Sequence, residues 1–295
     1  MGAAAAYVEE WRGENVSLSE VEQALFDLRR EAADEQGRPE LRTSVMTHIA
    51  WVPPEWHEAA WTTLEGLAER HPSRAILLVP GGVSDEDKLC ARVQLAAYEL
   101  PGERRHVAAE IVELRLGSRR ARSPASVVMP LLIRGLPVFC RLRGRPAFGQ
   151  PVLSDLVGLA DRIVVDSREW GDPAADYPRL AELFDAVAVS DIAWRRTMQR
   201  RIELASEWPE IGGCSELRVV GPAAEAHLLA GWLRSRLERD VTLVHEPADE
   251  IESVAFDGRE LDEPPVEPLD PSELLSGELE AFGRDRVYEA AVRAA

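Results

Sequence analysis

A tryptophan and several arginines are concentrated between positions 189 and 201 of a chain whose formal net charge is −18. Trp194 offers a large amphipathic surface, and the planar guanidinium groups of Arg195, Arg196 and Arg200 match carboxylates or phosphates. The segment holds no acid, base or nucleophile pair at catalytic spacing. These residue types therefore indicate a partner-binding surface rather than a catalytic centre.

The same segment has a second interpretation, as a half-buried helix with a solvated arginine face. On such a helix the apolar side chains of Ile192 and Met198 face a core. The sequence leaves both interpretations open.

A second group of cations, Arg119, Arg120 and Arg122, precedes a predicted helix whose first turn holds Pro124. The amino end of a helix carries partial positive charge, so this group is the candidate anion-binding site. Three further arginines that are candidates to join it are Arg141, Arg143 and Arg145. The alternative is an exposed arginine-rich loop in a protein whose one lysine is Lys88.

Other motifs for metal, phosphate or nucleophile chemistry are incomplete. Asp85-Glu86-Asp87 has the Asp-x-Asp pattern of some metal-dependent transferases, but acidic loops are common in so acidic a chain. His57-Glu58 lacks the second histidine of a zinc-protease helix, and Gly81-Gly82 lacks the rest of a phosphate loop. Asp166-Ser167 is better explained as a helix cap than as a nucleophile, because no elbow motif surrounds it. We therefore expect no catalytic residue, no metal and no cofactor.

Composition restricts the classes of partner and the compartment. A chain of 295 residues with 45% hydrophobic and 29% charged residues is globular and long enough for one large or two medium domains. The negative charge argues against nucleic acid and anionic membranes as partners. The sequence has neither a secretory signal nor ~20 consecutive apolar residues, which predicts a cytoplasmic protein. Three scattered cysteines, Cys90, Cys140 and Cys214, are expected to be reduced and mostly structural.

The first predicted element is an amphipathic helix. Ser19 and Glu22 have the spacing of a capping box, and the helix is expected to run to about Ala33. A strand at 43–52, a helix at 56–71 and a strand at 74–79 then predict a β-α-β unit with a buried parallel sheet.

Alternating segments at 89–95 and 107–116 predict an antiparallel hairpin added to that sheet, with its turn at Pro101-Gly102. Helices and strands continue to alternate up to position 206, and a β, α, β, β order follows from 217 to 256. The fold class is therefore α/β, with a mixed, largely parallel sheet flanked by helices and a smaller C-terminal α/β portion. The predicted domains are an N-terminal helix and linker (1–40), a main α/β domain (41–210), a small α/β portion (211–258) and an acidic, proline-rich arm with a terminal helix (259–295).

Taken in order, several segments resemble the OpcA family, the glucose-6-phosphate dehydrogenase assembly proteins of bacteria. The resemblance runs from the first helix to about Gly258. The segments that carry it are RTSVMTH (42–48), HPSR (71–74), VVMPLL (127–132), LPV (136–138), LADRIVVDS (159–167) and DIAW (191–194).

The resemblance implies a non-enzymatic partner that binds glucose-6-phosphate dehydrogenase and promotes its oligomerisation and activity in the oxidative pentose phosphate pathway. It makes Trp194 and its arginines the expected contact. Family members often carry tryptophans where this chain has Cys140-Arg141-Leu142, and Pro-Trp-Arg where it has Met198-Gln199-Arg200. If those aromatics are partner anchors in other members, the contact here must differ. The alternative from another class is an α/β enzyme or sensor that binds a small phosphorylated metabolite through the Arg119 loop.

Overall fold

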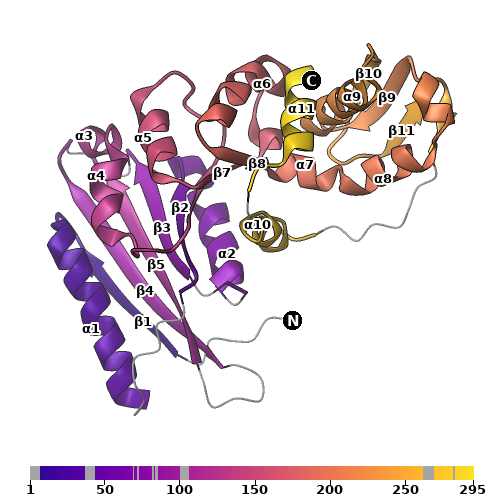
Figure 1. Ribbon diagram of the computed structural model, residues 1–295. Coiled ribbons are helices and arrows are strands. Elements are labelled where there is room, and N and C mark those ends of the chain that lie inside the picture. Colours follow the sequence, from indigo (N-terminus) through magenta and orange to yellow (C-terminus); the bar gives the residue numbers. More distant parts are fainter. Residues whose placement is uncertain are drawn as a thin grey trace. The chain divides into compact units, whose positions relative to one another are not determined.

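The computed structural model describes residues 7–36, 44–68, 70–71, 73–81, 83, 86–99, 106–261, 269–281 and 283–295. The strands of its larger sheet are β1 (Tyr7–Gly13), β2 (Met46–Trp51), β3 (Ser73–Pro80), β4 (Leu89–Glu99), β5 (His106–Leu116), β6 (Val138–Leu142), β7 (Arg162–Val165) and β8 (Ala188–Asp191). Their order is β1-β4-β5-β3-β2-β6-β7-β8. The smaller sheet contains β9 (Glu216–Gly221), β10 (Thr242–Pro247), β11 (Ser253–Phe256) and β12 (Arg259–Glu260), in the order β10-β9-β11-β12 (Figure 1).

Strand pairing confirms the predicted fold class. β2 pairs with β3 and β6 in parallel, and β3 pairs with β5 in parallel. The predicted hairpin is confirmed, because β4 and β5 are antiparallel from Leu89 opposite Leu116 onward, although its turn at Pro101-Gly102 lies outside the described residues. β1 was not predicted, and it pairs antiparallel with β4 at the edge of the sheet.

The chain divides into two compact units. Unit 1 comprises Met1–Ile163 and Pro271–Leu279, and unit 2 comprises Val164–Asp270 and Glu280–Ala295. The boundary falls within β7 rather than near position 210. The domain limits proposed from the sequence stay a prediction.

The helices of unit 1 are α1 (Leu18–Gln36), η1 (Pro54–Trp56), α2 (His57–Ala68), α3 (Ser118–Ala121), α4 (Pro124–Val128), η2 (Met129–Leu131), α5 (Pro151–Leu159) and α10 (Pro271–Leu279). The capping box of α1 is formed by Ser17 and Glu20, whose backbone N–H groups each donate to the other's side chain, and not by Ser19 and Glu22. Only the earlier pair spans the helix start.

Helices α1 and α2 contact opposite faces of β5 (Figure 1). Arg29 of α1 forms an ion pair with Glu110, whereas His57 of α2 lies 3.2 Å from Glu113. Because strand side chains alternate in direction, residues three apart point to opposite sides. The centre of the sheet is apolar, and Ile49, Ile76 and Leu77 are fully buried there.

The helices of unit 2 are η3 (Ser167–Glu169), α6 (Pro173–Ala181), η4 (Glu182–Asp185), α7 (Ile192–Arg196), α8 (Met198–Ser206), η5 (Glu210–Gly213), α9 (Ala223–Leu237) and α11 (Arg286–Ala294). α11 packs closely against α9 (Figure 1). A Cβ atom at Gly231 would collide with the backbone of Ala291 and Ala295, so this crossing requires a glycine. Arg234 Nη1 also donates to Ala294 O at 2.9 Å.

Candidate functional site

The predicted helix at 189–201 is divided into three elements. Residues 189–191 belong to β8, and α7 and α8 follow, separated by Thr197. Asp191 Oδ1 accepts hydrogen bonds from Ala193 N at 2.9 Å and Ser167 N at 3.0 Å. This buried carboxylate therefore caps α7 and joins it to the segment that follows β7.

Trp194 lies inside unit 2 and is 6% exposed. Its Nε1 donates to Asp285 Oδ2 at 3.0 Å, and its ring packs against Tyr288 of α11, with 5.7 Å between centroids. The guanidinium carbon of Arg201 lies 3.5 Å from the indole centroid, and burial lowers the pKa of Arg201 to about 10. Trp194 therefore connects α7 to the C-terminal helix and presents little surface to solvent.

Arg196 belongs to a network of charges that neutralise one another. Its Nη1 and Nη2 donate to Asp166 Oδ1 and Oδ2 at 2.8 and 3.0 Å, and Nη1 lies 3.9 Å from Glu225. Arg168 Nε donates to Glu225 at 2.7 Å, and its two terminal nitrogens donate to Glu250 at 2.8 and 3.1 Å. Such paired, fork-like contacts fix the ends of β7, α7 and α9 within unit 2.

Arg200 and Arg195 differ in their surroundings. Arg200 is 8% exposed and donates to Glu203 at 3.1 Å, one turn along α8. Arg195 is half-buried. Of the four sequence candidates, Trp194, Arg196 and Arg200 therefore have side chains committed to contacts within unit 2. Their role in binding a partner stays a prediction.

The prediction that Asp166-Ser167 caps a helix is confirmed. Asp166 Oδ1 accepts from Arg168 N at 3.3 Å at the start of η3. Ser167 is fully buried, and its Oγ lies 3.1 Å from the hydroxyl of Tyr177, which donates to Ala224 O. A hydroxyl enclosed in this way cannot reach a substrate.

The neighbouring Asp191 is also closed to solvent. Burial and the adjacent Asp166 carboxylate raise its pKa to about 7. A raised pKa in a buried carboxylate is common at catalytic centres, but here both oxygens face helix-capping N–H groups and the Tyr288 hydroxyl. The arrangement stabilises the fold of unit 2.

The exposed surface of α8 is apolar, contrary to expectation. Met198, Ile202 and Trp208 are 53%, 55% and 67% exposed, and Ala205 between them is also exposed. We call these four residues the α8 surface. Ile192 faces the core as predicted, but the assignment of Met198 to the core was wrong. Thr197 ends α7 and starts a new helix, and this break changes which positions face inward.

The Arg119 group is bound to its own loop. Arg119 forms an ion pair with Asp87, and Arg120 Nε donates to Asp87 O at 2.7 Å. The first-turn N–H of Ala125 in α4 already donates to a carboxylate, Asp155 Oδ2, at 3.0 Å. Arg122 is exposed. Anion binding by this group stays a prediction, although two of its three guanidiniums have an acceptor in the loop.

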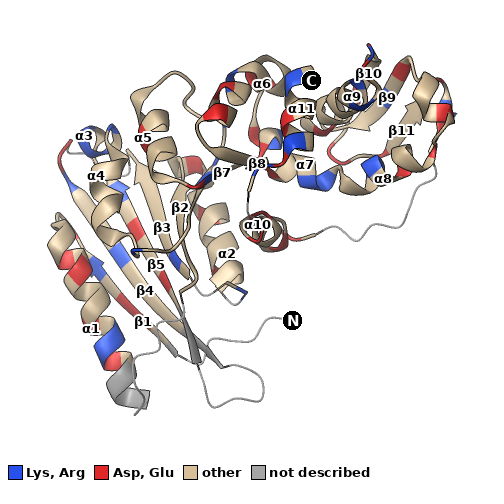
Figure 2. Ribbon diagram, in the orientation of Figure 1, with Lys and Arg blue, Asp and Glu red and all other residues tan. Residues whose placement is uncertain are grey.

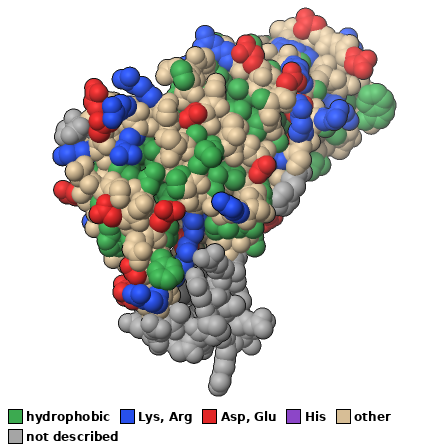
Figure 3. Space-filling model, turned by 60° about the vertical axis from the view of Figure 1, so that its left-hand side comes forward, with side chains coloured by type: hydrophobic (Ala, Val, Ile, Leu, Met, Phe, Trp, Pro, Cys, Tyr) green, Lys and Arg blue, Asp and Glu red, His purple; other side chains and the backbone are tan. Residues whose placement is uncertain are grey.

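The three later arginines have separate surroundings. Arg141 is buried in β6 and donates to Leu142 O, Arg143 lies over the Trp56 ring, and Arg145 lies over Phe148. On the face shown in Figure 3, acidic and basic side chains are interspersed among hydrophobic ones. Charge of one sign therefore does not dominate that face.

Metal-ligand geometry is not found in the part of the chain that the structure describes. No group of three or more His, Cys, Asp or Glu side chains is placed to hold an ion there. Of the Asp-x-Asp motif, Asp85 lies outside the described residues, and Asp87 is paired with Arg119. Among the same described residues, no helix is both long and apolar enough to cross a membrane.

Comparison with known proteins finds a similarity over part of the chain. Residues 65–182 match the family model described as "Glucose-6-phosphate dehydrogenase subunit N-terminal domain". Over this range the chain is similar to the OpcA family. The matched range runs from α2 to the start of η4, so it includes strands β3 to β7 of the larger sheet but neither β8 nor the α8 surface.

Three relatives are named "Putative OxPP cycle protein OpcA". The relative from Nostoc punctiforme is 28% identical over 185 residues, which are 58% of this chain and 39% of the relative. The relative from Synechocystis is 28% identical over 206 residues, which are 64% of this chain and 42% of the relative. The relative from Synechococcus elongatus is 25% identical over 184 residues, which are 58% of this chain and 41% of the relative. The match therefore spans about two fifths of the length of these OpcA proteins.

Proposed function

We propose that this chain is a non-enzymatic accessory protein that binds glucose-6-phosphate dehydrogenase and promotes its oligomerisation and activity in the oxidative pentose phosphate pathway, in the cytoplasm. The observation that carries the proposal is the family match over residues 65–182, together with relatives named for the oxidative pentose phosphate cycle. The chemistry of the described residues supports a binding role. The charged side chains around β7 and β8 are paired with one another within unit 2.

The α8 surface is the part of unit 2 that best suits a protein partner. Aromatic and apolar side chains at the centre of an interface supply most of its binding energy, and Met198, Ile202 and Trp208 offer such side chains on one short segment. Glu203 and Glu207 on the same segment are already paired, with Arg200 and Arg259. We propose that Trp208 is the anchor and that half-buried Arg195 lies at the rim.

The buried residues that the sequence predicted as partner contacts have an indirect role in this proposal. Trp194, Arg196 and Arg200 hold α7 and α8 in place, so they affect the partner through the position of the α8 surface. Their substitution is expected to lower stability and binding together. Substitution of Trp208 is expected to lower binding alone.

The experiment is a reconstitution with glucose-6-phosphate dehydrogenase from the same organism. The two purified proteins are mixed at equal molar amounts, and their mass is followed by size-exclusion chromatography with light scattering. NADPH formation is measured with and without this chain, and heat-denatured chain is the control. We expect a joint complex and a faster rate, with no NADPH formed by this chain alone. A mixture in which the proteins elute separately at an unchanged rate would refute the proposal.

A further inference from the structure

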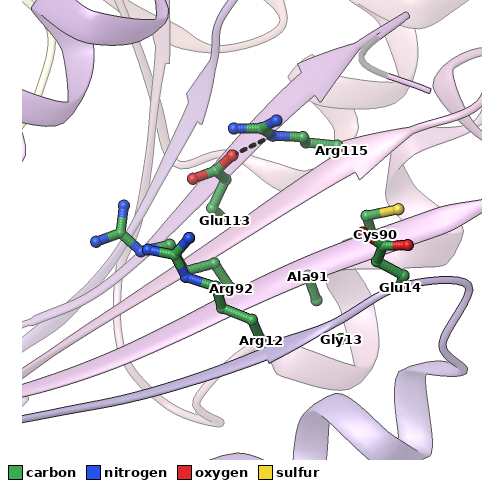
Figure 4. A pocket seen from close by; sticks show the side chains of 8 residues that line it. All are labelled: Arg12, Gly13, Glu14, Cys90, Ala91, Arg92, Glu113 and Arg115. Carbon is green, nitrogen blue, oxygen red and sulfur yellow. Dashed lines mark hydrogen bonds and ion pairs between the residues drawn. The ribbon is translucent and has the colours of Figure 1, made fainter.

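A pocket of about 420 Å³ opens on unit 1. None of the residues that line it belongs to the α8 surface. It lies on the face of β1, β4 and β5 that α2 also contacts, since Arg92 of β4 stacks on Trp61 of α2. Its lining residues are Arg12, Gly13, Glu14, Cys90, Ala91, Arg92, Glu113 and Arg115 (Figure 4). The volume is within the range of small-molecule sites.

Strand register brings these side chains together. Arg12 of β1 lies opposite Arg92 of β4, which lies opposite Glu113 of β5. Cys90 lies opposite Arg115 in the same ladder. Because alternate residues of a strand share one face, these positions point to the same side of the sheet. Figure 2 shows basic and acidic residues on these strands.

The three guanidiniums are positioned but retain donors. Arg115 Nε donates to Glu113 Oε1 at 2.6 Å, and Arg12 Nε donates to Glu10. Arg92 Nε donates to Glu10 Oε2 at 2.7 Å while its cation lies 3.9 Å from the Trp61 centroid. A guanidinium has five N–H donors, so contacts made through Nε leave the terminal nitrogens of Arg12 and Arg115 for another acceptor.

Glu113 has an unused acceptor beside these cations. It is 2% exposed, and within the described residues its Oε2 has no hydrogen-bond partner. His57 Nε2 lies 3.2 Å from the other oxygen, Oε1. In Figure 4 the carboxylate points to the side where the Arg12 and Arg92 guanidiniums lie. A buried carboxylate oxygen without a donor is costly, and a ligand hydroxyl would satisfy it.

We propose that this pocket binds a small phosphorylated polyol. The phosphate is bound by the terminal nitrogens of Arg12 and Arg115, with Arg92 adding charge, and a hydroxyl of the ligand donates to Glu113 Oε2. The planar guanidinium groups of arginine match the geometry of phosphate oxygens. Because the Glu113 carboxylate can accept a hydrogen bond from a hydroxyl, the pocket should prefer a phosphate that carries hydroxyl groups to inorganic phosphate. Five of the eight lining residues lie inside the matched family range, and Arg12, Gly13 and Glu14 lie outside it. The proposal does not depend on dehydrogenase binding.

Calorimetry on the full chain tests the chemistry with three probes, which are inorganic phosphate, glycerol and glycerol 3-phosphate. We expect glycerol 3-phosphate to bind about tenfold more tightly than inorganic phosphate, because one hydrogen bond to a buried carboxylate is gained. Glycerol alone should show no binding. Equal affinity for the two phosphates, or no binding of either, would overturn the proposal.

Variants then assign the binding to this pocket. Arg12→Leu changes an exposed side chain, so the fold should be kept, whereas Arg115→Leu also removes the donor to buried Glu113, so its melting temperature is checked first. Each should weaken glycerol 3-phosphate binding about tenfold. Glu113→Gln should strengthen binding of inorganic phosphate, because a repelling charge is removed, and should abolish the preference for glycerol 3-phosphate.

The matched control is Arg122→Leu in the Arg119 loop, which removes an exposed arginine from the rival anion site. It should leave all affinities unchanged. Loss of binding in Arg122→Leu, with Arg12→Leu and Arg115→Leu unaffected, would place the ligand in that loop and refute the pocket.

Discussion

Arg196 binds Asp166 through two parallel hydrogen bonds, from Nη1 to Oδ1 at 2.8 Å and from Nη2 to Oδ2 at 3.0 Å. The Asp166 side chain is 7% exposed and that of Arg196 is 21% exposed, so this pair is largely removed from water. It joins the end of β7 to α7. Arg196, which the sequence predicts as a partner contact, therefore stabilises the interior of unit 2.

Substitution of Arg196 should therefore lower the free energy of unfolding. Arg196→Ala leaves the Asp166 carboxylate buried without its cation, and we expect a loss of about 3 kcal/mol in the free energy of unfolding. Arg218→Ala is the control, because the Arg218–Glu246 pair is half-exposed and should contribute less than about 1 kcal/mol. Urea unfolding measures both. Equal losses in the two variants would contradict an internal role for Arg196.

Asp191 should make unit 2 less stable as pH rises. Burial and Asp166 raise its pKa from 3.8 to about 7, so the folded state holds a proton that the unfolded state has lost. Its contribution to stability is complete below about pH 4 and decreases by about 2–4 kcal/mol as pH rises to about 7. Asp191→Asn keeps an oxygen for the N–H groups of Ser167 and Ala193 and should remove this slope. The free energy of unfolding at several pH values measures it, and an Asn variant with the wild-type slope would refute the assignment.

His48 in β2 should make unit 1 sensitive to acid. It is fully buried, and within the described part of the chain neither ring nitrogen has a hydrogen-bond partner. Burial, with smaller effects of Arg141 and His71, lowers its pKa from 6.5 to about 3. Its contribution to stability is therefore complete above about pH 6.5 and is lost as pH falls toward 3, by up to about 4 kcal/mol.

The test is His48→Phe, which keeps a planar ring and removes the titration. The variant should unfold at a lower pH than the wild type and should be about as stable at neutral pH. Acid unfolding followed by circular dichroism gives the midpoint. An unchanged midpoint would show that other groups control acid unfolding.

The three cysteines should differ in reactivity. Burial raises the pKa of Cys140 to about 12, and burial together with Asp257 raises that of Cys214. Cys90 is half-buried and lines the pocket of unit 1, so it should react first, whereas the sequence predicts slow reaction at all three. Mass spectrometry of native protein during exposure to iodoacetamide gives the order. Modification of Cys140 as fast as Cys90 would contradict the burial of β6.

The fold was predictable where a pattern is local. The continuous apolar run of β3 and the alternation along β4 and β5 indicate strands without knowledge of their neighbours, and both are confirmed. Local patterns failed where two possible helix starts lie close together, and where one helix ends and the next begins. Ser17 and Ser19 both precede a glutamate by three, and the end of α7 at Thr197 has no glycine or proline to mark it.

The surroundings of the candidate site were less predictable, because they depend on distant segments. Trp194 is covered by α11 and its N-cap, which supply Tyr288 and Asp285 from about ninety positions later in the chain. No property of the 189–201 segment shows that this helix packs there. The pocket of unit 1 was missed for a related reason, since Arg12 joins Arg92 and Arg115 only through the register of β1, a strand that the sequence did not predict.

The central proposal is that glucose-6-phosphate dehydrogenase binds this chain through the α8 surface. Titration of the dehydrogenase with the wild-type chain and three variants tests this most directly. These are the wild type, Trp208→Ser, Ile202→Glu and, as a control, Phe26→Ser, which changes a hydrophobic residue of α1 that is 52% exposed. Each variant is first shown to melt at the wild-type temperature. We predict that the α8 substitutions each weaken binding by about 2 kcal/mol, roughly thirtyfold, and that Phe26→Ser binds normally. Wild-type affinity in both α8 variants would contradict the claim.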